Sequence, residues 1–211
     1  MKNGVVIYTI ALIMLLSGLA YGQQATIDLQ ALKFEDYKNA KVKNDQVFQD
    51  KSGDSYKIAI TDTRRGLFIK KDGKWLKHGV FYSVSSSSGK LSSQTTYIFD
   101  IKHGEYISYH ANGKVNFLYN YDKGNKHGKW YQYRDDGSLT TEKEFENGTQ
   151  VGYRIEYHRG SENSNGPVNF KVPYENGKMH GEKLQFNAEG ILVSKTTYQN
   201  GEKIGKTEWF H

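Results

Sequence analysis

The residues best suited to binding are aromatic and basic side chains that recur at one position of a repeated segment. Two residues after a regularly spaced glycine, an aromatic residue stands in three segments and a cation in the next two: Phe81, Tyr106, Trp130, Arg154 and Lys183. Aromatic residues and Arg are enriched at the energetic centres of protein interfaces. We interpret these five residues, the candidate stripe, as a surface for a protein partner.

Histidine also recurs, directly before the same glycines: His78, His103, His127 and His180. A zinc site needs several converging ligands, and none of these residues has a carboxylate or a second His at a short ligand spacing. The chain has no Cys, which excludes thiolate ligands, disulfides and Cys nucleophiles. We therefore expect no metal and no cofactor, and interpret the four His residues as polar groups beside turns.

Catalytic motifs are missing from the sequence. It contains no G-x-S-x-G pattern, no H-E-x-x-H pattern and no calcium-binding loop. Two neighbouring carboxylates, Asp135 and Asp136, fall at the tip of an expected hairpin, where solvent is expected to leave their acidity ordinary. We therefore expect that the protein is not an enzyme.

The spacing of glycine indicates which elements position the candidate stripe. A first series consists of Gly79, Gly104, Gly128, Gly152, Gly181 and Gly205, at intervals of 25, 24, 24, 29 and 24 residues. A second series consists of Gly89, Gly113, Gly137, Gly166 and Gly190. A third series, mostly preceded by Asn, consists of Gly124, Gly148, Gly177 and Gly201. A fixed period of this length is typical of a repeat protein.

Between the glycines, apolar and polar side chains alternate, as where Tyr131 and Tyr133 flank Gln132. A period of two favours β-strands, and glycine at this frequency disfavours helices. Tight turns are expected at the second-series glycines and at the Asn-Gly pairs. We predict an all-β fold, a single extended antiparallel β-meander of hairpin repeats with a period of about 24 residues and about eleven or twelve strands. The candidate stripe then lies on one exposed face, unless both faces are partly covered.

The N-terminal third departs from this pattern. Residues 1–22 place Lys2 before an apolar stretch and end in small residues, the layout of a secretory signal peptide. Residues 23–72 fit the period poorly, although 56–60 and 66–69 resemble strands, and we interpret them as an N-terminal cap or a degenerate repeat. The repeat array is expected over residues 73–211. The predicted signal indicates an exported protein that is periplasmic, on the cell surface or secreted.

The overall charge is modestly basic, with 29 Lys and Arg against 23 Asp and Glu. No long basic run occurs, so we do not expect nucleic acid as a partner. An anionic membrane surface stays open as a partner because basic proteins can associate with anionic lipids.

The segments HGKWYQYRDDGSLTTEKEFENG at 127–148 and NGKMHGEKLQFNAEGILVSKTTYQNG at 176–201 resemble the membrane-occupation-and-recognition-nexus (MORN) repeat. The resemblance is greater to the bacterial variant found among antitoxins of toxin–antitoxin systems. It covers roughly residues 73–211 and implies a non-enzymatic scaffold for protein partners or, sometimes, lipid. We expect an exported protein-binding or scaffold module. The alternatives are an antitoxin-like protein that neutralises a toxin and a lipid-binding module of the membrane surface.

Overall fold

The structure is a computed structural model that describes residues 9–12, 25–28, 47–49, 53–160 and 164–210. Every helix or strand that it describes in these ranges is a β-strand, so the predicted all-β class is confirmed. No helix in the described ranges is long and apolar enough to cross a membrane. Most of the predicted signal peptide lies outside the described residues and stays a prediction. The chain folds into two compact units, residues 1–101 and 102–211.

The first unit contains two antiparallel sheets. Its strands are β1 (Thr9–Leu12), β2 (Ala25–Asp28), β3 (Val47–Gln49), β4 (Ser55–Ile60), β5 (Arg64–Lys71), β6 (Lys74–Lys77), β7 (Gly79–Val84) and β8 (Leu91–Ile98). β1 pairs with β2, whereas β3, β4 and β5 form a meander that continues through β6 and β7 to β8. The strands predicted at 56–60 and 66–69 correspond to β4 and β5.

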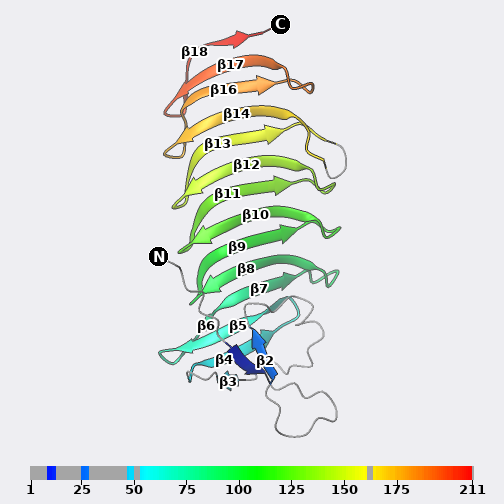
Figure 1. The fold of residues 1–211 in the computed structure, drawn as a ribbon, viewed down its shortest axis with the longest axis vertical. Coiled ribbons are helices and arrows are strands. Elements are labelled where there is room, and N and C mark those ends of the chain that lie inside the picture. The colour runs from blue at the N-terminus through cyan, green and yellow to red at the C-terminus, as the bar shows by residue number, and fades with distance from the viewer. Residues whose placement is uncertain (1–8, 13–24, 29–46, 50–52, 161–163, 211) are drawn as a thin grey trace. The chain divides into compact units, whose positions relative to one another are not determined.

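The second unit is an antiparallel meander in which strands follow one another in chain order (Figure 1). Its strands are β9 (Ile101–Tyr109), β10 (Val115–Asp122), β11 (Asn125–Tyr133), β12 (Leu139–Glu146), β13 (Thr149–Tyr157), β14 (Val168–Glu175), β15 (Lys178–Met179), β16 (Gly181–Phe186), β17 (Leu192–Gln199) and β18 (Glu202–Trp209). Both β15 and β16 pair with β14 and are two pieces of one strand, as are β6 and β7 on β5. If each of these two pairs is counted as one strand, the described part of residues 73–211 contains eleven strands, in agreement with the predicted eleven or twelve.

The Asn-Gly pairs form the two-residue turns that the sequence predicts. Asn147 and Gly148 both have positive φ, 49° and 85°, as a type I′ turn requires. Phe99 and Asp100 adopt the same conformation, with φ of 49° and 65°, although no glycine is present. The Asp100 carboxylate compensates by accepting a hydrogen bond of 2.8 Å from the Lys77 N–H. The turn type therefore survives the loss of its usual residue.

Four first-series glycines, Gly104, Gly128, Gly152 and Gly205, lie inside strands, and Gly79 and Gly181 begin β7 and β16. Gly128 lies within β11 with φ of 76°, and the pairing of β10 with β11 shifts register between Tyr119 and Asn120. Such a β-bulge bends the strand and increases its twist, and its left-handed backbone favours glycine. The 24-residue period therefore repeats a bulge as well as two turns.

The buried apolar core of the first unit lies on one face of its sheet. Its members are Tyr56, Ile58, Leu67, Ile69 and Tyr82. On the other face, the Phe81 ring lies directly on Gly66, where a Cβ atom would come within 2.4 Å of the ring. The Phe81 ring thus packs against the backbone of β5 at Gly66, the position where that strand has no side chain.

Candidate binding face

Four of the five stripe residues share one face of the second unit, where the strand register connects them through neighbours. Tyr106 pairs with Tyr119, Tyr119 with Trp130, and Trp130 with Lys143. The same face continues through Arg154, which pairs with Val172, and through Lys183, which pairs with Thr196. We call this face the basic face, and its residues Tyr106, Tyr119, Trp130, Lys143, Arg154, Val172 and Lys183 the central row. Phe81 belongs to the first unit.

The rings at one end of the central row stack on one another. The Tyr106 and Tyr119 ring centroids are 4.6 Å apart, and those of Tyr119 and Trp130 are 6.3 Å apart. Phe117 contributes a further ring at 5.3 Å from Trp130. Aromatic pairs at such distances attract beyond their burial of apolar area, so this part of the face is held in place by its own side chains.

The expectation that Trp130 is exposed is wrong, because only 8% of its surface is accessible. Phe117 and Tyr119 pack beside it, and the Lys143 ammonium group lies 4.6 Å from its ring centroid. Tyr106 is half-buried. The aromatic part of the stripe is therefore largely structural, and its contribution to a surface comes through the cations that cover it.

Cations lie over several rings of the basic face. Lys126 Nζ is 5.1 Å from the Tyr119 centroid and 5.3 Å from that of Phe145. The Phe170 ring is flanked by two cations, with Arg154 Cζ at 5.5 Å and Lys183 Nζ at 4.5 Å. A ring face attracts a cation through its quadrupole, and each such contact stabilises by about 0.5–1 kcal/mol at exposed sites.

The two faces of the second unit differ in charge. The comparison leaves out the first and last residue of each strand. Among the remaining strand residues, the basic face carries one acid, Glu156, and six cations: Lys102, Lys126, Lys143, Arg154, Lys183 and Lys203. The opposite face, which we call the mixed-charge face, carries Lys129, Lys171, Lys195, Lys206, Glu105, Glu142, Glu144, Glu182 and Glu208. Positive charge is therefore concentrated on the face that holds the stripe.

Electrostatics within the basic face reflect this imbalance. The pKa of Lys143 is lowered from its ordinary value of 10.5, first by burial and then by the positive charges of Arg154 and Lys126. Glu156 opposes the shift but also accepts a hydrogen bond from Arg154. The cations at the centre of the row thus repel one another, and Glu156 offsets that repulsion only in part.

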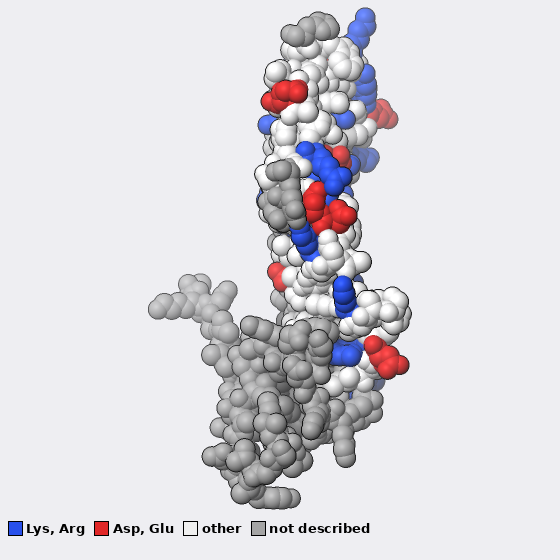
Figure 2. Space-filling view, turned by 90° about the vertical axis from the view of Figure 1, so that its right-hand side faces the viewer, with Lys and Arg blue, Asp and Glu red and all other residues white. Residues whose placement is uncertain are grey.

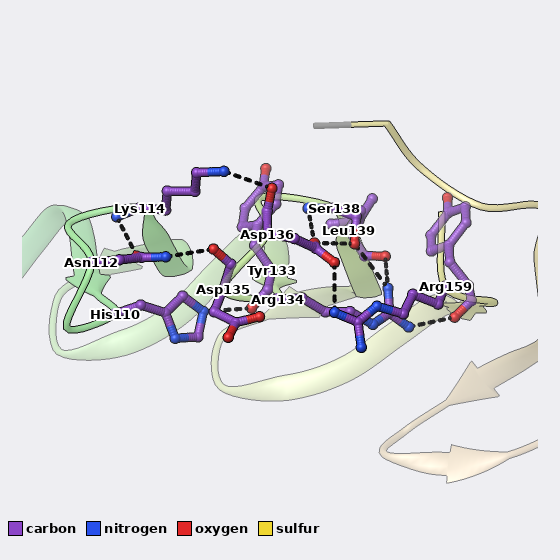
Figure 3. Close-up of polar contacts among 11 residues, drawn as sticks. His110, Asn112, Lys114, Tyr133, Arg134, Asp135, Asp136, Ser138, Leu139 and Arg159 are labelled. Atoms are coloured by element: carbon purple, nitrogen blue, oxygen red, sulfur yellow. Dashed lines mark hydrogen bonds and ion pairs between the residues drawn. The ribbon is translucent and has the colours of Figure 1, made fainter. Parts of the chain in front are cut away.

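The edge formed by the second-series turns binds successive hairpins together (Figure 3). Arg134 donates to the Leu139 carbonyl at 2.8 Å and to the Tyr157 carbonyl of the next hairpin at 2.9 Å. His110 Nε2 lies 2.9 Å from the Tyr133 carbonyl, so this nitrogen carries the proton. Figure 2 views this side of the molecule and shows cations and carboxylates interspersed. The edge supports the sheet and has no single sign of charge.

Asp136, at one of these tips, is not the ordinary carboxylate that we expected. It accepts hydrogen bonds from the Ser138 N–H at 2.8 Å and the Ser138 hydroxyl at 2.6 Å, and it pairs with Arg159. These interactions lower its pKa from 3.8 to about 2, with the Ser138 hydroxyl as the main cause. Its contribution to stability is complete above pH 3.8 and is lost as the pH falls through about 2. Asp136 therefore anchors a turn.

Two of the four recurrent His residues each lie beside a single carboxylate. His103 Nδ1 lies 3.2 Å from Asp122, and His180 Nε2 lies 3.9 Å from Glu175. Among the residues that the structure describes, no three His, Cys, Asp or Glu side chains are grouped so that they could hold a metal ion.

Several residues of the basic face were not identified from the sequence, namely Lys126, Tyr119, Lys143 and Phe170. Tyr119, Lys143 and Phe170 lie on strands that alternate with those of the stripe, whereas Lys126 lies on β11 with Trp130. A signal was present, because Tyr119 and Lys143 each stand six residues after a second-series glycine. To place these two residues beside the stripe would have required the strand register of each hairpin, which the length of its turn determines.

Three segments of the chain match the MORN repeat variant. They are residues 102–123, 126–147 and 179–200, and each covers all but the first residue of one hairpin of the second unit. The hairpin between the last two matches belongs to the longest repeat, in which the interval from Gly152 to Gly181 is 29 residues and not 24. MORN repeats are generally associated with membrane or protein binding. The expected resemblance is thus confirmed for three repeats, while the antitoxin grouping and the bacterial origin stay predictions.

No curated protein matches this chain.

Proposed function

We propose that this protein is an exported, non-enzymatic binding or scaffold module that holds a protein partner on the basic face of its MORN-variant hairpins. The observation that carries the proposal is the line of cations Lys143, Arg154 and Lys183, which the strand register places on one face and which lie over packed rings. Arg is one of the residues that dominate binding energy in protein interfaces. Export rests on the signal predicted at residues 1–22, which favours a periplasmic, surface or secreted location.

A matched pair of variants tests the proposal. Lys143→Gln with Lys183→Gln removes two charges from the basic face, and Lys129→Gln with Lys195→Gln removes two from the mixed-charge face. Each tagged protein is used to capture partners from native cell-envelope extract after its fold is checked by circular dichroism. We expect a partner that the wild-type chain and the mixed-charge variant retain and the basic-face variant loses. Equal recovery with all three proteins would place binding elsewhere.

A membrane-surface role is the second candidate, because the net positive charge of the basic face also suits anionic lipid. Its test is flotation with vesicles of phosphatidylcholine containing phosphatidylglycerol, repeated at raised salt. Binding that the basic-face variant loses would favour this role. An antitoxin-like role would require a toxin in the compartment to which the predicted signal directs the chain, and localisation of the protein tests it.

A further inference from the structure

The basic face carries positive charge that its own side chains do not neutralise. Its single acid within the strands, Glu156, already pairs with Arg154. On the mixed-charge face, by contrast, Lys129 pairs with Glu144 at 2.9 Å, and Lys195 lies 3.2 Å from Glu182 and 3.4 Å from Glu208. The two faces come from the same strands, so this difference is a property of the side-chain alternation. A ligand of the basic face is therefore expected to be anionic.

The cations are held at defined positions by the rings beneath them. Arg154 and Lys183 share the Phe170 ring and lie within about 10 Å of each other. Because these cations cover the rings, the aromatic faces are occupied, which disfavours stacking of a sugar and insertion of the rings into a membrane. The groups that a ligand meets are ammonium and guanidinium groups, which bind carboxylates well.

The cations of the central row follow a line across the strands. Lys143 lies on β12, Arg154 on β13 and Lys183 on β16, and β14 lies between the last two. Neighbouring strands are ~4.8 Å apart, so Lys143 and Lys183 are separated by ~14 Å, the length of about four residues of extended peptide. A linear ligand matches this arrangement better than a planar surface does.

Hydrogen-bond donors without a partner lie on the same face. Ser108 Oγ, Gln150 Nε2 and Arg154 Nε are buried and have no hydrogen-bond partner in the described structure. All three belong to positions that the register places on the basic face. These atoms are inaccessible, so the groups that a ligand meets on this face are the cations Lys143, Arg154 and Lys183.

We infer that the ligand of the basic face is an extended acidic peptide segment of the protein partner, whose Glu or Asp carboxylates bind Lys143, Arg154 and Lys183. This inference rests on the proposed function and adds the chemistry of the partner. Alternate side chains of an extended peptide point the same way and are ~6.7 Å apart, which lets successive carboxylates reach different cations of the row. The neutral polar groups beside the row, Gln132 and Gln185, then face the peptide backbone.

The lowered pKa of Lys143 supports the inference, and a change in this pKa on addition of peptide reports whether a carboxylate binds there. Its pKa is lowered by burial and by neighbouring cations. A bound carboxylate would favour the ammonium form and raise this pKa towards 10.5. A lysine with a purely structural role would show no change when peptide is added.

The test measures binding of the full chain to a fluorescent peptide of alternating Glu and Ser, ~10 residues and thus up to ~33 Å long. The control peptide replaces Glu with Gln. We expect the Glu peptide alone to bind, with affinity that falls as salt is raised.

Lys143→Gln with Lys183→Gln should weaken binding at least about tenfold, because each lost carboxylate contact raises the dissociation rate. Lys129→Gln with Lys195→Gln should have little effect. In nuclear magnetic resonance titrations, the Lys143 pKa should rise on binding.

Three outcomes would overturn the inference. Equal weakening by both pairs of variants would mean that only net charge matters. Binding to phosphatidylglycerol vesicles but not to the Glu peptide would identify a membrane ligand instead. Capture of a partner through the basic face that the Glu peptide fails to displace would refute the acidic ligand while leaving the proposed function intact.

Discussion

At the residue scale, each first-series glycine adopts a backbone conformation that other residues avoid. Gly128 is the clearest case, because its φ is 76° and a Cβ atom built on it would have no other atom within 4 Å. Any effect of a side chain there would come from the backbone conformation and not from a clash. The bulge therefore depends on glycine for conformational reasons alone.

Replacement of Gly128 with Ala should accordingly lower the free energy of unfolding by about 1–2 kcal/mol, the cost of a left-handed conformation. Urea denaturation of the variant and the wild type measures this difference in the free energy of unfolding. Gly128→Asn is the control, since Asn tolerates this conformation better and should cost less. An Ala variant as stable as the wild type would show that the bulge does not need a left-handed residue.

At the scale of strands and hairpins, both edges of the second unit carry bonds between repeats. The N–H groups of third-series glycines donate to carbonyls of the preceding hairpin, as Gly124 does to Lys102 and Gly148 to Lys126, both at 2.8 Å. At the other edge, His110, Arg134 and His158 occupy one repeat position and reach carbonyls of the following hairpin. These bonds maintain the spacing of the strands and therefore that of the central row.

Arg134→Met should lower the free energy of unfolding by about 1.5–3 kcal/mol, because it removes charged hydrogen bonds while keeping much of the apolar stem. The control is Arg159→Met, whose side chain is 71% exposed and forms an ion pair with Asp136. An exposed ion pair contributes little to stability, so the control should lose less. Thermal or urea denaturation of both variants compares them, and equal losses would contradict the stabilising role of the Arg134 contacts.

At the scale of the whole molecule, stability should vary along the second unit. In a repeat array each hairpin is stabilised by its neighbours, so local stability follows the contacts that each strand makes. In β18 only Thr207 is half-buried and the other residues are exposed, whereas β12 contains the buried Leu139 and Thr141. Cooperative unfolding is therefore expected to begin at β18.

Amide hydrogen exchange tests this gradient. Amides of β18 should exchange much faster than those of β11, β12 and β13 under native conditions, because local opening there exposes little new apolar surface. The loop after β13 is excluded from the comparison. Uniform protection across the unit would mean that it unfolds only as a whole.

Much of the fold could be predicted because the pattern is local and repeated. Asn-Gly pairs and alternating polarity indicate turns and strands through the conformations of a few adjacent residues. The bulges at the first-series glycines were not predicted, because a glycine at positive φ serves a bulge and a turn equally well. Trp130 was expected to be exposed, because its burial depends on Phe117 and Lys143, which lie on neighbouring strands.

The sequence by itself determined the repeat, the turn positions and the residues that share a strand face, since these follow from backbone sterics and the two-residue period. Only the tertiary structure decided that Tyr119 and Lys143 complete the central row and that positive charge gathers on one face. Cross-strand register brings Tyr106 and Tyr119, thirteen residues apart, into stacking contact. That register depends on bulges and turn geometry acting together, which no single position in the sequence specifies.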